Sequence, residues 1–199
     1  MSAPWFIAFE GGEASGKSTQ AARLAARMGA VLTREPGGTA VGEQVRSILL
    51  DPATIDLDDR AEALLMAAAR AQHVAEVIRP ALAAGRSVVT DRYTASSVAY
   101  QGHGRGLETD EVLRLSAWAT GGLRPDLTVL LEVDAAVART RLGVLDRFEA
   151  AGEGFHRRVA AGFRAQAAAD PDHWVVIDGS APPDSVEALV RAAVDERLT

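Results

Sequence analysis

The stretch that decides the fold is Trp5-Phe6-Ile7-Ala8-Phe9-Glu10-Gly11-Gly12-Glu13-Ala14-Ser15-Gly16-Lys17-Ser18. Its first half is a short apolar run that ends in a glutamate and glycines, which is typical of a buried strand of a parallel sheet entering a turn. Its second half fits the pattern G-x-x-x-x-G-K-[ST], and a helix is expected to follow from about Ser18 to Met28. Strand, loop and helix in this order predict a phosphate-binding loop.

Each residue type in this loop has a role in binding a nucleoside triphosphate. The glycines let backbone N–H groups converge on phosphate oxygens, and the positive end of the helix adds to their attraction. The ammonium group of Lys17 can reach the terminal phosphates, and the hydroxyl of Ser18 can ligate Mg²⁺. Lys17 is the single lysine among 21 basic residues, so the chain uses arginine everywhere else. The residues predicted to bind ATP are Gly11, Gly12, Glu13, Ala14, Ser15, Gly16, Lys17, Ser18 and Thr19.

The rest of the chain alternates apolar strands with helices. Further strands are predicted at 31–33, 87–90, 127–133 and 174–177. Residues 59–82 are rich in alanine and leucine at helical spacing. This alternation predicts an α/β P-loop NTPase fold, with a parallel sheet flanked by helices on both faces and ligands at the carboxyl ends of the strands. The glycine-containing stretches 102–106 and 143–154 are predicted to be mobile loops.

Composition narrows the classes of protein and partner. The chain has 199 residues, 48% of them apolar, which predicts one compact domain over 1–199. It has no run of about 18 apolar residues and no signal-type amino terminus, so we expect a cytoplasmic protein without a membrane partner. Without cysteine it has no thiolate metal site or cysteine nucleophile. The net charge of -6 argues against nucleic acid as a partner, so a phosphate ligand should be a small molecule.

Charged residues outside the loop complete the predicted chemistry. Asp91 follows the strand 87–90 and could assist Mg²⁺ together with Ser18. Phosphoryl transfer accumulates negative charge on oxygen atoms, so arginines near the loop would stabilise it. The candidates are Arg34, Arg92, Arg139, Arg141 and Arg147. The histidines show no metal-ligand spacing, and each is expected to be a surface or partly packed side chain.

Four further segments occur in a fixed order along the chain. They are TREPGGT at 33–39, DRYTASSVAYQG at 91–102, RPDL at 124–127 and LDRFE at 145–149. Together they resemble the signatures of bacterial thymidylate kinases. The resemblance implies Mg²⁺-dependent transfer of the terminal phosphoryl group of ATP to thymidine 5'-monophosphate (dTMP), giving dTDP and ADP, by a homodimer.

The resemblance also implies roles for individual residues that bind the acceptor. Arg34 would lie near the acceptor phosphate, and Arg92 would meet phosphates between donor and acceptor. Glu13 would approach the sugar hydroxyl. Arg70 would read a thymine carbonyl, and Tyr100 would crowd the 2' position of the sugar and so favour deoxyribose.

Three more positions would form the base pocket and its cover. Ser97 and Gln101 match positions that contact the base in relatives. Met66 stands where relatives commonly carry a phenylalanine that stacks on thymine; a thioether can cover a base face less rigidly. The segment 139–152 is expected to be a short lid that closes over ATP. The predicted catalytic residues are Lys17, Arg92, Arg141 and Arg147.

Two other functions stay open at this stage. A kinase for another nucleoside monophosphate or a free deoxynucleoside would share the loop and lid, and a panel of acceptors would separate it from the first reading. A P-loop switch or assembly ATPase would use nucleotide binding to change partners, and acceptor-independent hydrolysis would favour it.

Overall fold

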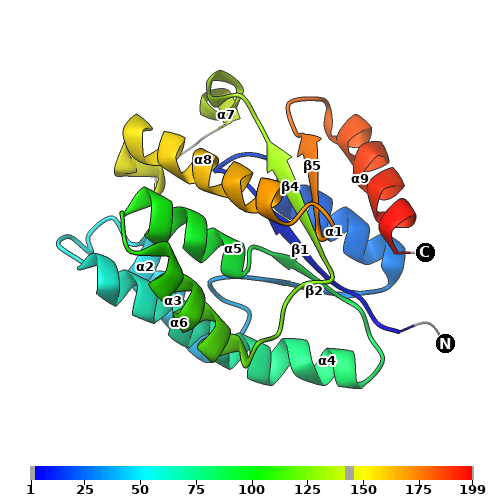
Figure 1. Ribbon diagram of the computed structural model, residues 1–199, viewed down its shortest axis with the longest axis horizontal. Coiled ribbons are helices and arrows are strands. Elements are labelled where there is room, and N and C mark those ends of the chain that lie inside the picture. Colours follow the sequence, from blue (N-terminus) through cyan, green and yellow to red (C-terminus); the bar gives the residue numbers. More distant parts are fainter. Residues whose placement is uncertain (1–2, 142–145, 199) are drawn as a thin grey trace.

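The computed structural model describes residues 3–141 and 146–198, apart from the side chains of Ala135 and Arg139, and confirms the predicted α/β class (Figure 1). Within these residues, five strands form one sheet of order β2-β3-β1-β4-β5, in which all neighbours are parallel. The strands are β1 (Phe6–Glu10), β2 (Val31–Arg34), β3 (Val88–Asp91), β4 (Leu127–Glu132) and β5 (Trp174–Asp178). Each lies where the sequence predicts a strand.

Helices connect the strands and cover both faces of the sheet. They are α1 (Lys17–Met28), α2 (Ala40–Leu50), α3 (Asp59–His73), α4 (Arg79–Ala83), α5 (Thr94–Ser97), α6 (Thr109–Thr120), α7 (Ala135–Arg141), α8 (Glu153–Ala169) and α9 (Pro183–Arg197). Two π-helical segments, η1 (Val74–Ile78) and η2 (Val98–Gly104), continue α3 and α5, and η3 (Glu149–Ala151) is a 3₁₀ turn. No helix in the described part of the chain is long and apolar enough to cross a membrane.

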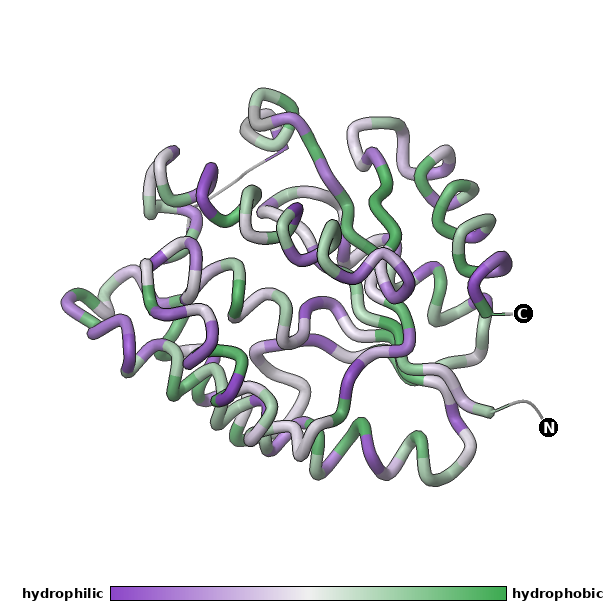
Figure 2. The backbone as a smooth tube through the Cα atoms, in the orientation of Figure 1, coloured by the Kyte–Doolittle hydropathy of each residue, from purple (hydrophilic) through white to green (hydrophobic). Residues whose placement is uncertain are grey.

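Side chains of β1 alternate between two cores because successive residues of a strand face opposite sides of the sheet. Ile7 and Phe9 pack in one cluster with residues of α1 and α9. Phe6 packs in another with Ile78 and Tyr93. Figure 1 shows α1 beside α9, with α3 and α4 on the other side of the sheet, and Figure 2 shows the strands as mostly apolar. Burial on both faces explains why the central strands β1, β3 and β4 read as continuous apolar runs.

The prediction of a mobile loop at 102–106 is wrong for most of its length. Gly102 and Gly104 are buried within η2. A Cβ on Gly104 would lie 2.6 Å from Cε2 of Phe155 on α8. Glycine at this position therefore allows close packing between η2 and α8, a use of glycine that a sequence pattern does not distinguish from flexibility.

The second predicted loop, 143–154, is described from residue 146 onward; residues 142–145, which belong to the predicted lid, lie outside the described residues. The described remainder is largely helical. Oδ1 of Asp146 accepts hydrogen bonds from the backbone N–H groups of Phe148 and Glu149, both at 2.9 Å, and η3 follows directly. Helix α8 begins at Glu153.

Parallel pairing brings the carboxyl ends of the central strands to one edge of the sheet. Arg34 at the end of β2 pairs with Asp91 at the end of β3, and Asp91 pairs with Phe9 of β1. The loop that follows β1 therefore starts beside the residues that follow β3. This edge carries the candidate site, as expected for an open parallel sheet.

Candidate active site

The loop between β1 and α1 has a backbone that only glycine can adopt at its first position. Gly11 has φ of 145°, and a Cβ there would lie 2.4 Å from the carbonyl oxygen of Leu131. Gly16 precedes α1 with φ of 90°, and no described side chain caps this end of the helix. The first N–H groups of α1 are therefore directed to the space in front of the loop, where an anion can accept hydrogen bonds.

Lys17 is held inside this loop. Its Nζ donates to the carbonyl oxygen of Gly12 at 2.5 Å and to Oγ of Ser15 at 3.2 Å, and the residue is only 6% exposed. Burial, together with the charge of Arg92, lowers the pKa of Lys17 to about 8. The ammonium group lacks a paired carboxylate at hydrogen-bond distance among the described residues, so a bound phosphate would supply the missing negative charge.

Ser18 and Asp91, the two predicted metal ligands, are in contact. Oγ of Ser18 donates a short hydrogen bond to Oδ2 of Asp91. Oδ1 of Asp91 is buried and has no hydrogen-bond partner among the described residues. Mg²⁺ prefers oxygen ligands and completes its shell with phosphate oxygens and water, so this pair fits a Mg²⁺ ion bound with a nucleotide.

Arg92 donates hydrogen bonds to four other residues of the site. It follows β3 with φ of 71°, a left-handed conformation that is costly for any residue other than glycine. Its Nη1 donates to the carbonyl oxygen of Gly11 at 3.0 Å and to Oγ of Ser96 at 3.1 Å. Its Nη2 donates to Oε1 of Glu13 at 2.8 Å and to the hydroxyl of Tyr100 at 3.0 Å. Strain at a residue with this many polar contacts is typical of a functional position.

Glu13, Tyr100 and Arg92 form a closed hydrogen-bonded group. The Tyr100 hydroxyl donates to Oε1 of Glu13 at 2.5 Å. Burial alone would raise the pKa of Glu13, but the charges of Arg92 and Lys17 and the hydrogen bond from Tyr100 outweigh it and lower the pKa to about 2. Burial also raises the pKa of Tyr100 well above its ordinary value, so this hydroxyl remains a donor.

These pKa values predict how stability depends on acid. The pKa of Glu13 falls from its ordinary 4.5 to about 2 on folding, so its contribution is complete above pH 4.5 and is lost as the pH drops toward 2. The loss amounts to about 3 kcal/mol. Glu13→Gln should therefore lose less unfolding free energy than wild type between pH 5 and pH 2.5, measured by urea unfolding. Glu108→Gln, which removes an exposed carboxyl group, should follow the wild-type curve; equal acid loss in all three proteins would contradict the prediction.

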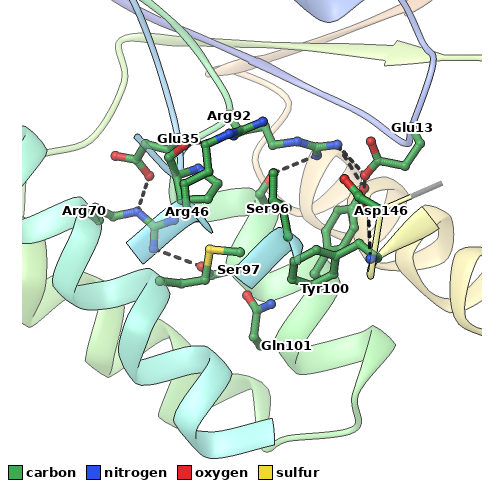
Figure 3. Close-up of a pocket in the computed structure, with 14 residues that line it drawn as sticks. Glu13, Glu35, Arg46, Arg70, Arg92, Ser96, Ser97, Tyr100, Gln101 and Asp146 are labelled. Carbon is green, nitrogen blue, oxygen red and sulfur yellow. Dashed lines mark hydrogen bonds and ion pairs between the residues drawn. The ribbon is translucent and has the colours of Figure 1, made fainter. Parts of the chain in front are cut away.

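Two pockets meet at Glu13, Glu35, Arg46 and Arg92, which line both. The larger, of about 810 Å³, lies in front of the phosphate loop. Its other lining residues include Ala14, Ser15, Gly16, Lys17, Ser18, Thr19, Arg34, Asp91 and Arg141. The smaller, shown in Figure 3, is lined among others by Met66, Arg70, Ser97, Tyr100 and Gln101. Most of the predicted donor residues thus line one pocket and the predicted base-contacting residues line the other, and the ion pair of Glu13 and Arg92 lies in the wall that the two pockets share.

Arg70 lines the smaller pocket, and hydrogen bonds fix the orientation of its guanidinium group. Its Nε donates to Oε2 of Glu35 at 2.6 Å, and its Nη1 donates to Oγ of Ser97 at 3.0 Å. Its Nη2 donates to the carbonyl oxygen of Tyr93 at 3.1 Å. Arg70 is 2% exposed, and its ion-pair partner Glu35 is 4% exposed. Such a planar group with several fixed hydrogen bonds is suited to recognising a carbonyl in one orientation.

Apolar side chains form the remaining wall of this pocket. Met66 and Leu50 line it together with Phe148 and Tyr100. The rings of Tyr100 and Phe148 meet edge to face, with centroids 5.7 Å apart. A flat heterocycle in this pocket would therefore contact a thioether and aromatic edges.

The remaining predicted arginines differ in where they lie. Arg141 lines the larger pocket, where its Nη1 donates to the carbonyl oxygen of Gly179 at 3.1 Å. Arg34 lines the same pocket, with its Nη2 2.9 Å from Oε1 of Glu43. Arg147, predicted to be catalytic, is not among the described residues that line either pocket. The side chain of Arg139 lies outside the described residues.

Arg147 is instead part of the wall behind the smaller pocket. Its Nε donates to the carbonyl oxygen of Leu49 at 2.8 Å, and its Nη2 lies 2.7 Å from Oε2 of Glu62. Its guanidinium stacks over Phe148, 4.6 Å from the ring centroid. Arg147 therefore lies beside α3, where the buried carboxylate of Glu62 attracts its guanidinium group.

Sequence reasoning missed three participants. Arg46 lines both pockets and donates to the carbonyl oxygen of Pro36 at 2.9 Å, but it is one of several helical arginines without a motif. Glu35 forms an ion pair with Arg70, and the segment 33–39 that contains it carries no sequence signal for this partner. The expectation for His73 is wrong: the residue is fully buried, with Nδ1 2.9 Å from Oε1 of Glu35 and Nε2 2.6 Å from Oγ1 of Thr33. Both ring nitrogens have partners, so burial is not costly.

Comparison with known proteins identifies the family of the chain. The family model described as thymidylate kinase matches residues 9–190. The chain is 52% identical to the thymidylate kinase of Solidesulfovibrio magneticus, over 97% of this chain and 100% of that one. It is 49% identical to the thymidylate kinase of Deinococcus radiodurans, over 99% of each. The crystal structure of thymidylate kinase from Ehrlichia chaffeensis superposes with a TM-score of 0.80 at 30% identity, covering 97% of this chain and 100% of that chain. The chain therefore belongs to the thymidylate kinase family.

Proposed function

We propose that this protein transfers the terminal phosphoryl group of Mg·ATP to dTMP, giving dTDP and ADP. The observation that carries the proposal is the meeting of two pockets at Arg92 and Glu13, one at a phosphate loop and one around Arg70. A kinase needs its donor and acceptor phosphates in line, and an arginine between the two pockets is placed to touch both.

Catalysis by this site rests on positioning and electrostatic stabilisation. The N–H groups at the start of α1 and the ammonium of Lys17 would bind the donor phosphates. The guanidinium groups of Arg92 and Arg141 would offset the charge that develops during transfer. The acceptor phosphate is already anionic, so the reaction needs no separate general base. Ser18 and Asp91 would hold Mg²⁺, which neutralises phosphate charge when bound.

Recognition of the acceptor would use the smaller pocket. Arg70 and Ser97 are placed to hydrogen-bond the polar edge of the pyrimidine, and Met66 would lie against its face. Tyr100, whose hydroxyl is fixed by Arg92 and Glu13, would crowd the 2' position of the sugar. Arg34 would contact the acceptor phosphate from the larger pocket.

The first test is ADP formation with Mg·ATP and a panel of acceptors. dTMP, dUMP, dCMP and dGMP are compared with an acceptor-free control and with free thymidine. We expect dTMP to give the highest kcat/KM, with negligible ADP in its absence. Preference for another acceptor would support a different nucleotide kinase, and acceptor-independent ADP formation would support a P-loop ATPase.

We further propose that the single domain 1–199, with its lid at about 139–152, works in the cytoplasm as a homodimer. Three large apolar side chains on the adjoining helices α3 and α6 favour a partner there: Leu64, Leu113 and Trp118 are 57%, 47% and 82% exposed. Apolar side chains of this size at a surface suit an interface.

A substitution on α6 tests the dimer. Trp118→Glu should shift the sedimentation coefficient from that of a dimer to that of a monomer, because a carboxylate opposes burial of this surface. Leu189→Glu makes the same change on α9, at a residue that is 51% exposed, and should leave the dimer intact. A wild-type protein that sediments as a monomer at micromolar concentration would contradict the proposal.

A further inference from the structure

A buried ionic cluster lies behind the smaller pocket. Glu62 of α3 is 0% exposed. Its Oε2 lies 3.0 Å from Nη2 of Arg105 and 2.7 Å from Nη2 of Arg147. Its Oε1 accepts a hydrogen bond from Nε2 of Gln101 at 2.8 Å. Glu62 is therefore a buried carboxylate that accepts hydrogen bonds from Gln101 and Arg105 and forms an ion pair with Arg147.

Gln101 connects this cluster to the pocket. Gln101 is 0% exposed and lines the smaller pocket. Glu62 is not among the described residues that line this pocket. Figure 3 shows its amide end pointing toward Ser97 and Tyr100. Its Oε1 is buried and has no hydrogen-bond partner among the described residues. A buried acceptor without a donor is costly, so a ligand that donates a hydrogen bond to it would gain affinity.

The orientation of the amide follows from its neighbour. A carboxylate only accepts hydrogen bonds, so the amide must turn its NH₂ group toward Glu62 and its oxygen away from it. Rotating the amide by half a turn would place Oε1 of Gln101 against Oε1 of Glu62, two acceptors at hydrogen-bond distance. Arg147 contacts Oε2 of this carboxylate, and Arg105 contacts both of its oxygens, with Nε 3.2 Å from Oε1.

We propose that Glu62 is a positioning residue for base specificity: it holds the Gln101 amide so that an acceptor faces the pyrimidine. The inference rests on the proposed function and adds to it. Thymine and uracil carry an N–H at ring position 3, which can donate to Oε1 of Gln101. Cytosine carries an unprotonated ring nitrogen there, so Gln101 would have to turn its NH₂ group to the base. Glu62 opposes this turn, and cytosine is rejected by an unfavourable pair of acceptors.

The test compares acceptors in Glu62→Gln. Its amide can either accept from or donate to Gln101, so both orientations of Gln101 become allowed. We expect the ratio of kcat/KM for dTMP to that for dCMP to fall at least about tenfold, mainly because dCMP improves. The ratio for dTMP to dUMP should stay within about twofold of wild type, since both bases carry the same ring N–H. A general loosening of the pocket would shift both ratios.

Arg105→Gln is the matched control. It disturbs the same cluster but leaves the carboxylate that faces Gln101, so the dTMP to dCMP ratio should remain at the wild-type value. If Glu62→Gln does not fold, the double variant E62Q/R105Q removes the carboxylate together with one of its two arginines. It is then compared with R105Q alone, and the same fall in the ratio is expected.

The outcomes separate this inference from the proposed function. A wild-type protein that prefers dTMP, with an unchanged dTMP to dCMP ratio in a folded Glu62 variant, would overturn the role of Glu62 and leave the proposed function standing. An equal fall in R105Q would also overturn it. A wild-type protein that prefers dCMP would overturn both.

Discussion

Lys17→Ala should reduce kcat for dTMP-dependent ADP formation by about 10³-fold or more. Lys17 is the single lysine of the chain, and its ammonium group lies in the phosphate loop, where the developing charge of the transferred group needs a compact cation. The fold should survive, because burial already lowers the pKa of Lys17 to about 8 and so opposes its charge in the folded protein. The measurements are steady-state ADP release and the urea midpoint of unfolding.

Lys17→Arg serves as the comparison for geometry. Lys17 is 6% exposed, and its Nζ contacts the backbone of the loop, so a planar guanidinium does not fit the same position. We expect Lys17→Arg to recover little of the lost kcat although it keeps the charge. A Lys17→Ala protein within tenfold of wild-type kcat would remove Lys17 from the catalytic residues.

Arg70→Ala should be the most damaging change in the acceptor pocket, both to binding and to stability. The ion pair between Arg70 and Glu35 is buried on both sides, and removing one partner of such a pair costs about 3–5 kcal/mol. Loss of the fixed guanidinium should also raise KM for dTMP by about 100-fold, because the thymine carbonyl and Oγ of Ser97 both lose the donor that Arg70 supplies. KM for ATP should change little. Unfolding free energy and separate KM values for the two substrates measure these effects.

Two further variants separate the effect of Arg70 on dTMP binding from its effect on the stability of the fold. Arg70→Lys keeps a charge for Glu35 but loses the planar fork, so we expect most of the KM increase with less destabilisation. The double variant E35Q/R70A removes the buried carboxylate that has lost its guanidinium partner and should be more stable than Arg70→Ala alone. If KM for ATP rose as much as KM for dTMP, Arg70 would have a general structural role.

The phosphate loop and the strands around it were predictable from sequence because local rules determine them. A glycine-rich turn, a lysine and a hydroxyl between an apolar strand and a helix have few alternative explanations. The pairing of Ser18 with Asp91 also follows from strand order, since both flank carboxyl ends of adjacent strands. Local pattern and tertiary arrangement agree here.

The partners of distant residues were not predictable in the same way. Glu35, His73 and Glu62 are buried because they satisfy one another or nearby arginines, and no spacing in the sequence reveals such pairs. Arg147 illustrates the consequence: its lid context predicts a phosphate contact, but a buried carboxylate 85 positions earlier in the chain holds it. The glycines of η2 were also misinterpreted from the sequence, because glycine occurs both in flexible loops and where two helices pack closely.

Because Glu13 and Arg92 line both pockets, a substrate in either pocket would share contacts with a substrate in the other. A phosphate that draws the Arg92 guanidinium toward one pocket changes the partner left to Glu13 in the other. Thermodynamic linkage then requires reciprocity: whatever factor the nucleotide donor applies to the affinity for the acceptor, the acceptor applies to the affinity for the donor. We therefore expect the apparent affinity for each substrate to depend on the concentration of the other, through the ion pair of Glu13 and Arg92.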